Sequence, residues 1–296
     1  MTTPLVSVCC ITYNHASFIR KCLDGFLMQQ TDFPIEILIH DDCSTDGTTE
    51  IIREYEAKYP DLIFPLYEEE NQYSMGGAGK MDLYNYTRAR GKYIAYCEGD
   101  DYWTDPLKLQ KQVDFMEANP DYSVCWHRCK QFIIETGEYI DDRCGAILND
   151  KAGIEIDLDT YFSQWYTQPL TMVFRREAYD DSWREQYELY RDEHELYHLL
   201  KNGKGYLFSF YGGIYVRHSG GIYTSLTKSS QGETSLKVAK ELYQVNKDKY
   251  TKRFYASILQ WQIYENKDSF CKKWKYSWSL FCVEWKLKRL IRNLIR

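Results

Sequence analysis

The stretch VSVCCI at residues 6–11 decides the fold. It is a short, unbroken apolar run, which is typical of a strand covered on both faces. Residues 15–30 follow with apolar side chains at helical spacing. The same order then recurs as an apolar run at 35–39, a polar turn at 41–47 and a helical pattern at 48–59. Alternating strands and helices predict an α/β fold, with a mostly parallel sheet flanked by helices.

The rest of the chain extends this pattern. Further strands are expected at 62–67, 93–97, 171–174 and 206–216, helices at 107–118 and 185–200, and apolar runs lie at 122–126 and 131–134. Residues 220–232 are rich in Gly, Ser and Thr and predict a mobile loop, after which the pattern is helical. We therefore expect one domain over residues 1–230 and a C-terminal helical extension over 231–296.

Charge is distributed unevenly along the 296 residues. The net charge is −6, which excludes a generally basic nucleic-acid-binding protein. Residues 271–296, however, carry eight Lys or Arg against Glu284 alone, so this tail holds +7 and the preceding 270 residues hold −13. The basic tail is therefore treated as a separate element.

The ten cysteines lie mostly within apolar runs, and residues 1–5 lack the pattern of a secretory signal. Reduced thiols and a cytoplasmic location are therefore expected. Cys125 and Cys129 flank Trp126 and His127, but this spacing matches no usual zinc pattern.

Polar clusters follow three of the expected strands. TYN at 12–14 follows the first strand, DD at 41–42 the second, and EGDD at 98–101 the strand at 93–97. Loops at the carboxyl ends of parallel strands are neighbours in space even when they are distant in sequence. We expect the three clusters to build a single crevice.

The cluster at 98–101 concentrates carboxylates, which repel one another unless a cation or hydrogen-bond donors compensate them. A hard divalent cation, Mg²⁺ or Mn²⁺, takes one or two such oxygens and leaves its other positions to phosphates and water. Asp100 and Asp101 fit that role. The alternative is a cap for the following helix, a role that residues 104–105 already fill and that leaves Glu98 and Asp100 unexplained.

Asp42 and Lys80 are candidates for binding a nucleotide. A carboxylate at the end of the second strand can accept hydrogen bonds from a base or a ribose hydroxyl; the alternative for Asp42 is a helix cap. Lys80 ends the Gly-rich stretch MGGAGK, which departs from the phosphate-loop motif at Ser74 and Met81. Lys80 is expected as a cation near phosphate or base. No Gly-x-Gly-x-x-Gly follows the first strand, which argues against a nicotinamide dinucleotide.

Three blocks together resemble the family 2 glycosyltransferases. These are VSVCCITYN, IHDDCSTDGT and GKYIAYCEGDDYWTDPLKL, in the order and spacing of that family over about residues 4–130, with later matches to about residue 225. The resemblance implies the GT-A fold, with a Rossmann-like sheet. It also implies inverting transfer of a sugar from a nucleotide-diphosphate sugar, with Mn²⁺ or Mg²⁺ holding the diphosphate. We expect a UDP-linked donor.

The resemblance also implies roles for individual residues. The base-binding aspartate of the family matches Asp42, and the edge after the first strand matches Thr12 and Tyr13, although Ile11 stands where the family has Pro. The Asp-x-Asp-Asp motif matches residues 98–101, with Asp100 and Asp101 as the sugar-nucleotide and metal aspartates.

Two residues are assigned to the pocket for the donor sugar or the acceptor. Glu98 stands where the family motif has its first Asp. Trp103 offers an aromatic face that suits a sugar ring; the alternative is an ordinary core residue.

The catalytic base is assigned to Asp192, which matches the acidic position of the family when the chain is aligned back from Gly203. Glu193 is the second choice, and a plain surface charge is the alternative. His218 follows the last core strand and is expected to contact the leaving diphosphate, with Arg217 as the other candidate. The family spacing Tyr-Arg-x-His is rearranged here to Tyr-x-Arg-His. A buried, structurally satisfied histidine is the alternative for His218.

The basic tail at 271–296 combines cations with one aromatic and apolar helical face, formed by Trp274, Trp278, Phe281, Trp285 and Leu294. It is too charged to span a bilayer and fits an interfacial helix on an anionic membrane surface. The alternative is a helix packed on the catalytic domain or on a partner.

These expectations describe a peripheral protein on the inner face of the cell membrane that extends a lipid-linked (polyprenyl diphosphate) glycan. Sugar-phosphate nucleotidyl transfer and a non-catalytic, nucleotide-binding membrane scaffold are the alternatives.

Overall fold

A computed structural model describes residues 3–77, 82–162, 168–221, 226–266, 269 and 272–283 of the chain. These residues fall into two compact units. The first unit comprises Met1–Asp157 and Trp165–Ser219, and the second comprises Leu158–Gln164 and Gly220–Arg296.

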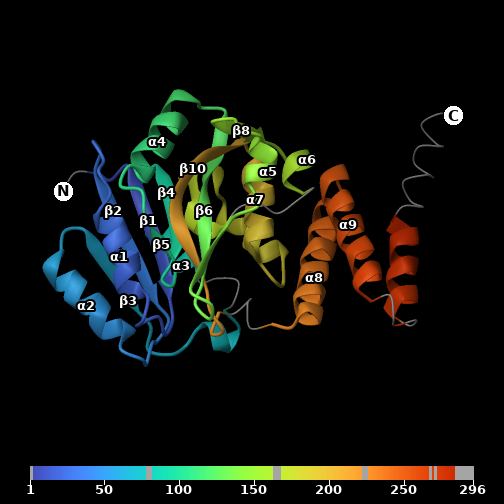
Figure 1. The fold of residues 1–296 in the computed structure, drawn as a ribbon, viewed down its shortest axis with the longest axis horizontal. Coiled ribbons are helices and arrows are strands. Elements are labelled where there is room, and N and C mark those ends of the chain that lie inside the picture. Colours follow the sequence, from blue (N-terminus) through green and yellow to red (C-terminus); the bar gives the residue numbers. More distant parts are fainter. Residues whose placement is uncertain are drawn as a thin grey trace. The chain divides into compact units, whose positions relative to one another are not determined.

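The first unit is built on one sheet with the strand order β3-β2-β1-β4-β9-β6-β10-β5 (Figure 1). Six strands run in one direction: β1 (Val6–Thr12), β2 (Ile35–Asp41), β3 (Ile63–Tyr67), β4 (Tyr93–Glu98), β6 (Tyr122–Ile133) and β10 (Lys204–Arg217). Four run against them: β5 (Tyr102–Trp103), β7 (Glu138–Asp141), β8 (Gly153–Ile156) and β9 (Met172–Arg175). The predicted mostly parallel α/β sheet is therefore confirmed.

Helices cover both faces of this sheet, which explains why its central strands are apolar throughout. Side chains alternate between faces along β4: Ala95 and Cys97 join the core beneath α1 (Ile19–Leu27), α2 (Thr48–Lys58) and α4 (Lys108–Ala118). Tyr96 points to the other face, where its ring lies 6.3 Å from that of Tyr86 in α3 (Leu83–Tyr86). The first unit also contains α5 (Gly145–Leu148) and α7 (Asp192–Lys201).

The structure joins two apolar runs of the sequence and corrects the start of one predicted helix. The apolar runs at 122–126 and 131–134 belong to one long strand, β6. The helix predicted at 185–200 begins only at Asp192, because Asp181–Gln186 form a 3-10 turn capped by the Asp180 carboxylate and Tyr187 is extended. The later start places Asp192 in the first turn of α7.

The second unit consists of helices around a small apolar core. It contains α6 (Leu158–Tyr161), α8 (Lys228–Asn246), α9 (Lys249–Glu265) and a helix at 272–283. Lys247 turns the chain in the left-handed region, and the Asp248 carboxylate accepts the first N–H groups of α9. The core residues are Ala239, Tyr255, Leu259, Tyr276 and Val283. Part of the loop predicted at 220–232 is helical here, because α8 begins at Lys228.

Within the described ranges, no helix is both long enough and apolar enough to cross a bilayer.

Candidate active site

The carboxyl ends of β1, β2 and β4 lie side by side, as predicted. Thr12 pairs with Asp41 in the sheet register, and Ile11 pairs with Glu98. Backbone hydrogen bonds continue past the strand ends, since Asp42 N–H donates to Thr12 O at 3.0 Å and Gly99 N–H donates to Ile11 O at 2.9 Å. The three polar clusters therefore form one edge of the sheet.

The two neighbouring aspartates after β2 have different partners. The Asp41 carboxylate accepts hydrogen bonds from Ser44 and from the Thr49 hydroxyl, so it stabilises the turn into α2. The Asp42 carboxylate accepts the backbone N–H groups of Gln72 and Tyr73, at 2.7 and 3.1 Å. Asp42 therefore fixes the segment after β3 next to the candidate nucleotide site.

An acidic cluster forms at the end of β4. Glu98, Asp100 and Asp101 each offer one oxygen, and these oxygens lie within 4.8 Å of one another. Asp101 is only 1% exposed; its Oδ1 accepts Val216 N–H at 2.8 Å, while its Oδ2 is buried and has no hydrogen-bond partner among the described residues. A buried carboxylate oxygen without a donor fits a cation.

Helix capping does not explain this cluster. The Asp105 carboxylate accepts Leu107 N–H at 2.9 Å and pairs with Lys111 at 2.6 Å, so Asp105 serves the start of α4. That leaves Glu98, Asp100 and Asp101 for another role.

The pKa shifts of the three carboxyl groups indicate a site that favours positive charge. Burial, followed by the neighbouring carboxylates, raises the pKa values of Glu98 and Asp101 well above their usual ranges. Burial alone would also raise the pKa of Asp100, but the hydrogen bond and charge of His218 and the charge of His15 outweigh it and lower that pKa. A divalent cation would relieve the repulsion among the three carboxylates.

Two histidines reach Asp100. Nε2 of His218, at the end of β10, lies 3.0 Å from Asp100 Oδ2, and Nε2 of His15 lies 3.8 Å from the same oxygen. His15 is not among the residues predicted from the sequence; its position directly after Thr12-Tyr13-Asn14 was the available signal. Phe18 packs against the His218 ring with centroids 4.8 Å apart.

Asp192 lies close enough to this cluster to affect it. Its negative charge is one of the causes of the raised pKa of Glu98. The Asp192 side chain is open to solvent, yet the surrounding protein desolvates it and raises the pKa of its carboxyl against the opposing charge of Arg191. For Glu193, burial and then the charge of Asp192 raise the pKa to about 7.

A buried ion-pair network lies near Asp192. Arg184 pairs with Asp82 at 2.5 Å and with Glu195 at 3.6 Å, and Tyr86 Oη donates to Glu195 at 3.3 Å. These contacts connect α3, the 3-10 turn and the first turns of α7, so they help to fix the orientation of the helix that carries Asp192.

Three predicted site residues have different outcomes. Trp103 is 2% exposed, its Nε1 donates to Leu170 O at 2.9 Å, and its ring packs on Phe26, so it is a core residue and not a sugar-facing one. Tyr13, in the loop after β1, is 44% exposed. Lys80 lies outside the described residues.

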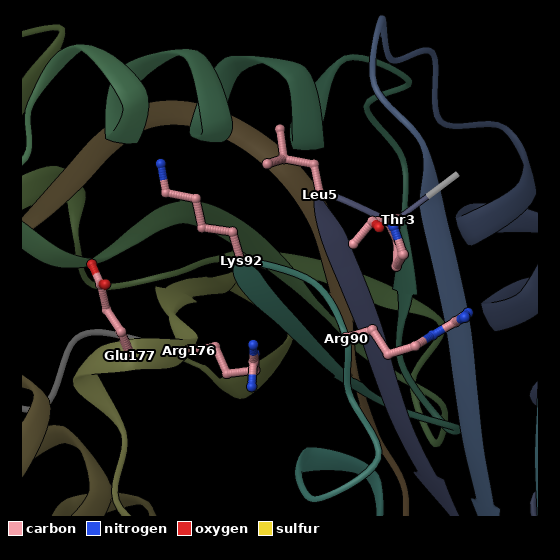
Figure 2. A pocket seen from close by; sticks show the side chains of 7 residues that line it. Thr3, Leu5, Arg90, Lys92, Arg176 and Glu177 are labelled. Carbon is pink, nitrogen blue, oxygen red and sulfur yellow. The ribbon is translucent and has the colours of Figure 1, made fainter. Parts of the chain in front are cut away.

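A separate hollow of about 560 Å³ lies beside the amino ends of β1 and β4 (Figure 2). Its lining includes Arg90, Lys92 and Arg176, but Arg90 pairs with Glu36 and Lys92 with Glu117. Its positive charge is therefore largely compensated, and it lies at the opposite end of these strands from the acidic cluster.

The sequence of this sheet domain matches a known family. Residues 7–183 match the profile of Glycosyl transferase family 2. The chain belongs to this family. The resemblance seen in the three sequence blocks is thus confirmed.

Relatives of the chain include proteins named as glycosyltransferases. The chain is 40% identical over 113 residues to the putative teichuronic acid biosynthesis glycosyltransferase TuaG of Bacillus subtilis, covering 38% of this chain and 42% of TuaG. It is 31% identical over 168 residues to the UDP-Glc:alpha-D-GlcNAc-diphosphoundecaprenol beta-1,3-glucosyltransferase WfaP of Escherichia coli, covering 51% of this chain and 62% of WfaP. The chain spans half or less of the length of the first curated relatives that it matches.

Solved structures confirm the GT-A fold. The structure of S. aureus TarS 1-349 in complex with UDP-GlcNAc superposes with a TM-score of 0.64 at 22% identity, covering 86% of this chain and 71% of TarS 1-349. At this identity the likeness concerns the fold.

Proposed function

We propose that this family 2 protein transfers a sugar, with inversion, from a UDP-sugar to a lipid-linked glycan during surface-polysaccharide synthesis. The observation that carries the proposal is the buried Oδ2 of Asp101, which has no partner in the described part of the chain and lies in an acidic cluster influenced by Asp192. This oxygen of Asp101 fits a cation that binds a diphosphate, and Asp192 fits a base that deprotonates an acceptor hydroxyl.

The comparisons supply the substrate classes of the proposal. The printed name of WfaP specifies a UDP-Glc donor and a diphosphoundecaprenol-linked acceptor, and TarS was crystallised with UDP-GlcNAc. Both proteins share the sheet domain with this chain, which supports a UDP-sugar donor and a lipid-linked acceptor here.

The donor would bind along the carboxyl edge of the sheet. Each oxygen of the Asp42 carboxylate accepts one backbone N–H and retains a lone pair, so Asp42 can still accept a hydrogen bond from the base. Tyr13 offers an exposed ring beside it, and Thr12 forms the floor. Asp100 and Asp101 would hold Mg²⁺ or Mn²⁺, which supplies positive charge against the diphosphate.

Transfer then requires a base and a leaving group. Asp192 removes the proton of the acceptor hydroxyl as the hydroxyl oxygen attacks the anomeric carbon. The bond from that carbon to the diphosphate oxygen breaks on the opposite side, and the electron pair leaves with the nucleoside diphosphate. His218, next to Asp100, would donate to the departing phosphate oxygens.

We also propose that the second unit attaches the protein to an anionic membrane surface. In the helix at 272–283, Trp274, Trp278 and Phe281 are 63%, 57% and 48% exposed, and their rings stack in sequence at 6.1 and 5.6 Å. Lysines accompany this stripe, which is the composition of an interfacial helix. Residues 284–296, which continue the basic tail, lie outside the described residues.

A transfer assay with UDP-sugars and an undecaprenyl-diphosphate-linked acceptor tests the enzymatic proposal. We expect cation-dependent product that EDTA abolishes, a product anomer inverted relative to the donor by NMR, and a loss of about 10²–10⁴-fold in kcat for Asp192→Asn. Glu193→Gln is the matched control and should retain most of the activity. Full activity of Asp192→Asn would refute the base assignment.

A further inference from the structure

The ring of His15 is held on several sides by its own loop and by the loop after β4. Its Nδ1 lies 3.1 Å from Thr12 Oγ1, and Phe18 lies edge-on to the ring with centroids 6.2 Å apart. Gly99 closes another side, since a Cβ there would lie 3.0 Å from His15 Nδ1 and 2.6 Å from Thr12 Oγ1. The ring orientation is therefore set by the protein.

This orientation brings Nε2 of His15 to within 3.8 Å of Asp100 Oδ2. His218 donates a hydrogen bond to the same oxygen at 3.0 Å, but 3.8 Å is too long for a hydrogen bond from His15. In the tautomer in which Nδ1–H donates to the Thr12 hydroxyl, Nε2 carries a lone pair and no proton. The lone pairs of His15 Nε2 and Asp100 Oδ2 then face the same space. This arrangement suits a cation bound by both atoms.

We propose that His15 is a nitrogen ligand of the divalent cation, beside Asp100 and Asp101. The inference rests on the proposed function, which requires a cation at this edge of the sheet. Neighbouring ligands at about 2.1 Å from an octahedral ion lie about 3 Å apart, so a shift of about 1 Å brings His15 Nε2 to that separation from Asp100 Oδ2. The buried, unpartnered Oδ2 of Asp101 is an independent sign that the cluster receives a cation.

Thr12 has a supporting role in this arrangement. Ligating histidines usually donate the N–H of their other ring nitrogen to a fixed acceptor, which selects the tautomer and orients the ring. Thr12 Oγ1 occupies that place, and Gly99 leaves the room that the pair needs. The residues after β1 are thereby linked to the acidic cluster after β4.

A nitrogen ligand changes which cation the centre prefers. Mg²⁺ favours oxygen ligands and keeps several waters, whereas first-row transition ions bind imidazole well. His15 should therefore favour Mn²⁺ over Mg²⁺, and Co²⁺ over Mn²⁺.

Cation binding to the full chain tests the proposal without reference to turnover. Mn²⁺ binding is followed by EPR, first with the ion alone and then with UDP, and Mg²⁺ and Co²⁺ are measured by competition. We expect His15→Gln to weaken Mn²⁺ at least about tenfold, as loss of metal-site contacts does, and to change Mg²⁺ less than about threefold. The nitrogen modulation in pulsed EPR of bound Mn²⁺ should also decrease.

His198→Gln is the matched control. His198 lies in α7, stacks on Trp183 and hydrogen-bonds with Tyr187 Oη, so its removal should leave the Mn²⁺ affinity unchanged. Thr12→Val, which is nearly isosteric, removes the Nδ1 partner and should cause a smaller loss that is again selective for Mn²⁺. If thermal unfolding shows that His15→Gln does not fold, the Mn²⁺ affinity of Thr12→Val tests the proposal instead.

Unchanged Mn²⁺ affinity and unchanged nitrogen modulation in His15→Gln, or equal losses of Mn²⁺ and Mg²⁺, would overturn the ligation by His15. Cation-dependent transfer by the wild-type protein would still uphold the proposed function. Conversely, a selective loss of Mn²⁺ in a protein that transfers no sugar would support His15 as a ligand and count against the proposed function.

Discussion

Val216 donates its backbone N–H to Asp101 Oδ1 at 2.8 Å and so ties the end of β10 to the loop after β4, across 115 residues of sequence. One oxygen of Asp101 is thus used by the fold, and the other is left for a ligand. The second half of the sheet therefore contributes directly to the geometry of the acidic cluster.

This division predicts different effects of two substitutions at Asp101. Asp101→Asn keeps an acceptor for Val216 N–H and removes a negative charge that is repelled in the metal-free protein, so we expect a higher unfolding temperature in EDTA and a loss of cation-dependent transfer. Asp101→Ala leaves the N–H without its acceptor and should cost about 1–3 kcal/mol of stability. Thermal unfolding and transfer assays check both; a lower stability of Asp101→Asn in EDTA would contradict the argument.

The raised pKa of Glu193 predicts a pH dependence of stability. Its carboxyl has a pKa of about 7 in the folded chain against an ordinary value of 4.5, so the folded state binds the proton more tightly than the unfolded state. The stability that this provides is present below pH 4.5 and is lost as the pH rises to about 7. Urea unfolding across this interval, in EDTA, should show a shallower decline for Glu193→Gln than for the wild type. An identical decline in both proteins would show that Glu193 does not contribute.

The aromatic stripe of the helix at 272–283 predicts membrane binding. We expect the protein to sediment with vesicles that contain anionic phosphatidylglycerol, and Trp274→Ala combined with Trp278→Ala to weaken this binding at least tenfold, because interfacial burial of aromatic side chains contributes much of it. Trp261→Ala in α9, where the side chain is 38% exposed, is the matched control. Equal binding of the double variant and the wild type would favour a protein partner for this helix.

Much of the fold and part of the site were predictable from local patterns. The unbroken apolar run of β1 reports burial on both faces, and the polar residues after β1, β2 and β4 report one sheet edge, because parallel strands end together. The sequence pattern predicts the start of α7 too early, because residues 185–186 belong to a capped 3-10 turn and Tyr187 is extended.

Contacts between distant segments account for what the sequence did not show. The approach of His15 and His218 to Asp100 joins residues that are 85 and 118 positions away from it, so neither contact has a local signal. Trp103 follows an acidic motif and carries one polar N–H group, so its sequence context fits a ligand pocket as well as a core. Its contacts with Phe26 and Leu170 show that it is a core residue.

The buried Lys108 predicts an increase in stability on substitution. Its Nζ lies 3.7 Å from the centroid of the Trp103 ring, without a hydrogen-bond partner among the described residues, and burial lowers its pKa to about 7. Lys108→Met should therefore raise the free energy of unfolding at pH 6 by about 1–4 kcal/mol. Because the folded pKa lies below the ordinary 10.5, wild-type stability should also rise from about pH 7 to 10.5, and the variant should lack this rise. Destabilisation by Lys108→Met would mean that the contact with Trp103 outweighs the cost of burial.

The close packing around Gly99 predicts that one added methyl group disrupts the cation site while the chain still folds. Its Cβ would lie 2.6 Å from Thr12 Oγ1 and 3.0 Å from His15 Nδ1, both of which belong to the cation-binding edge of the sheet. We expect Gly99→Ala to displace these side chains, to cost about 1–3 kcal/mol of stability and to weaken Mn²⁺ binding by at least tenfold. Gly137→Ala is the matched control for a loss confined to stability, since no atom of the described ranges lies within 4 Å of its Cβ and its positive φ of 71° opposes the change. Mn²⁺ affinity that is equally reduced in both variants would show that the effect of Gly99→Ala comes from general destabilisation and not from its contact with Thr12 and His15.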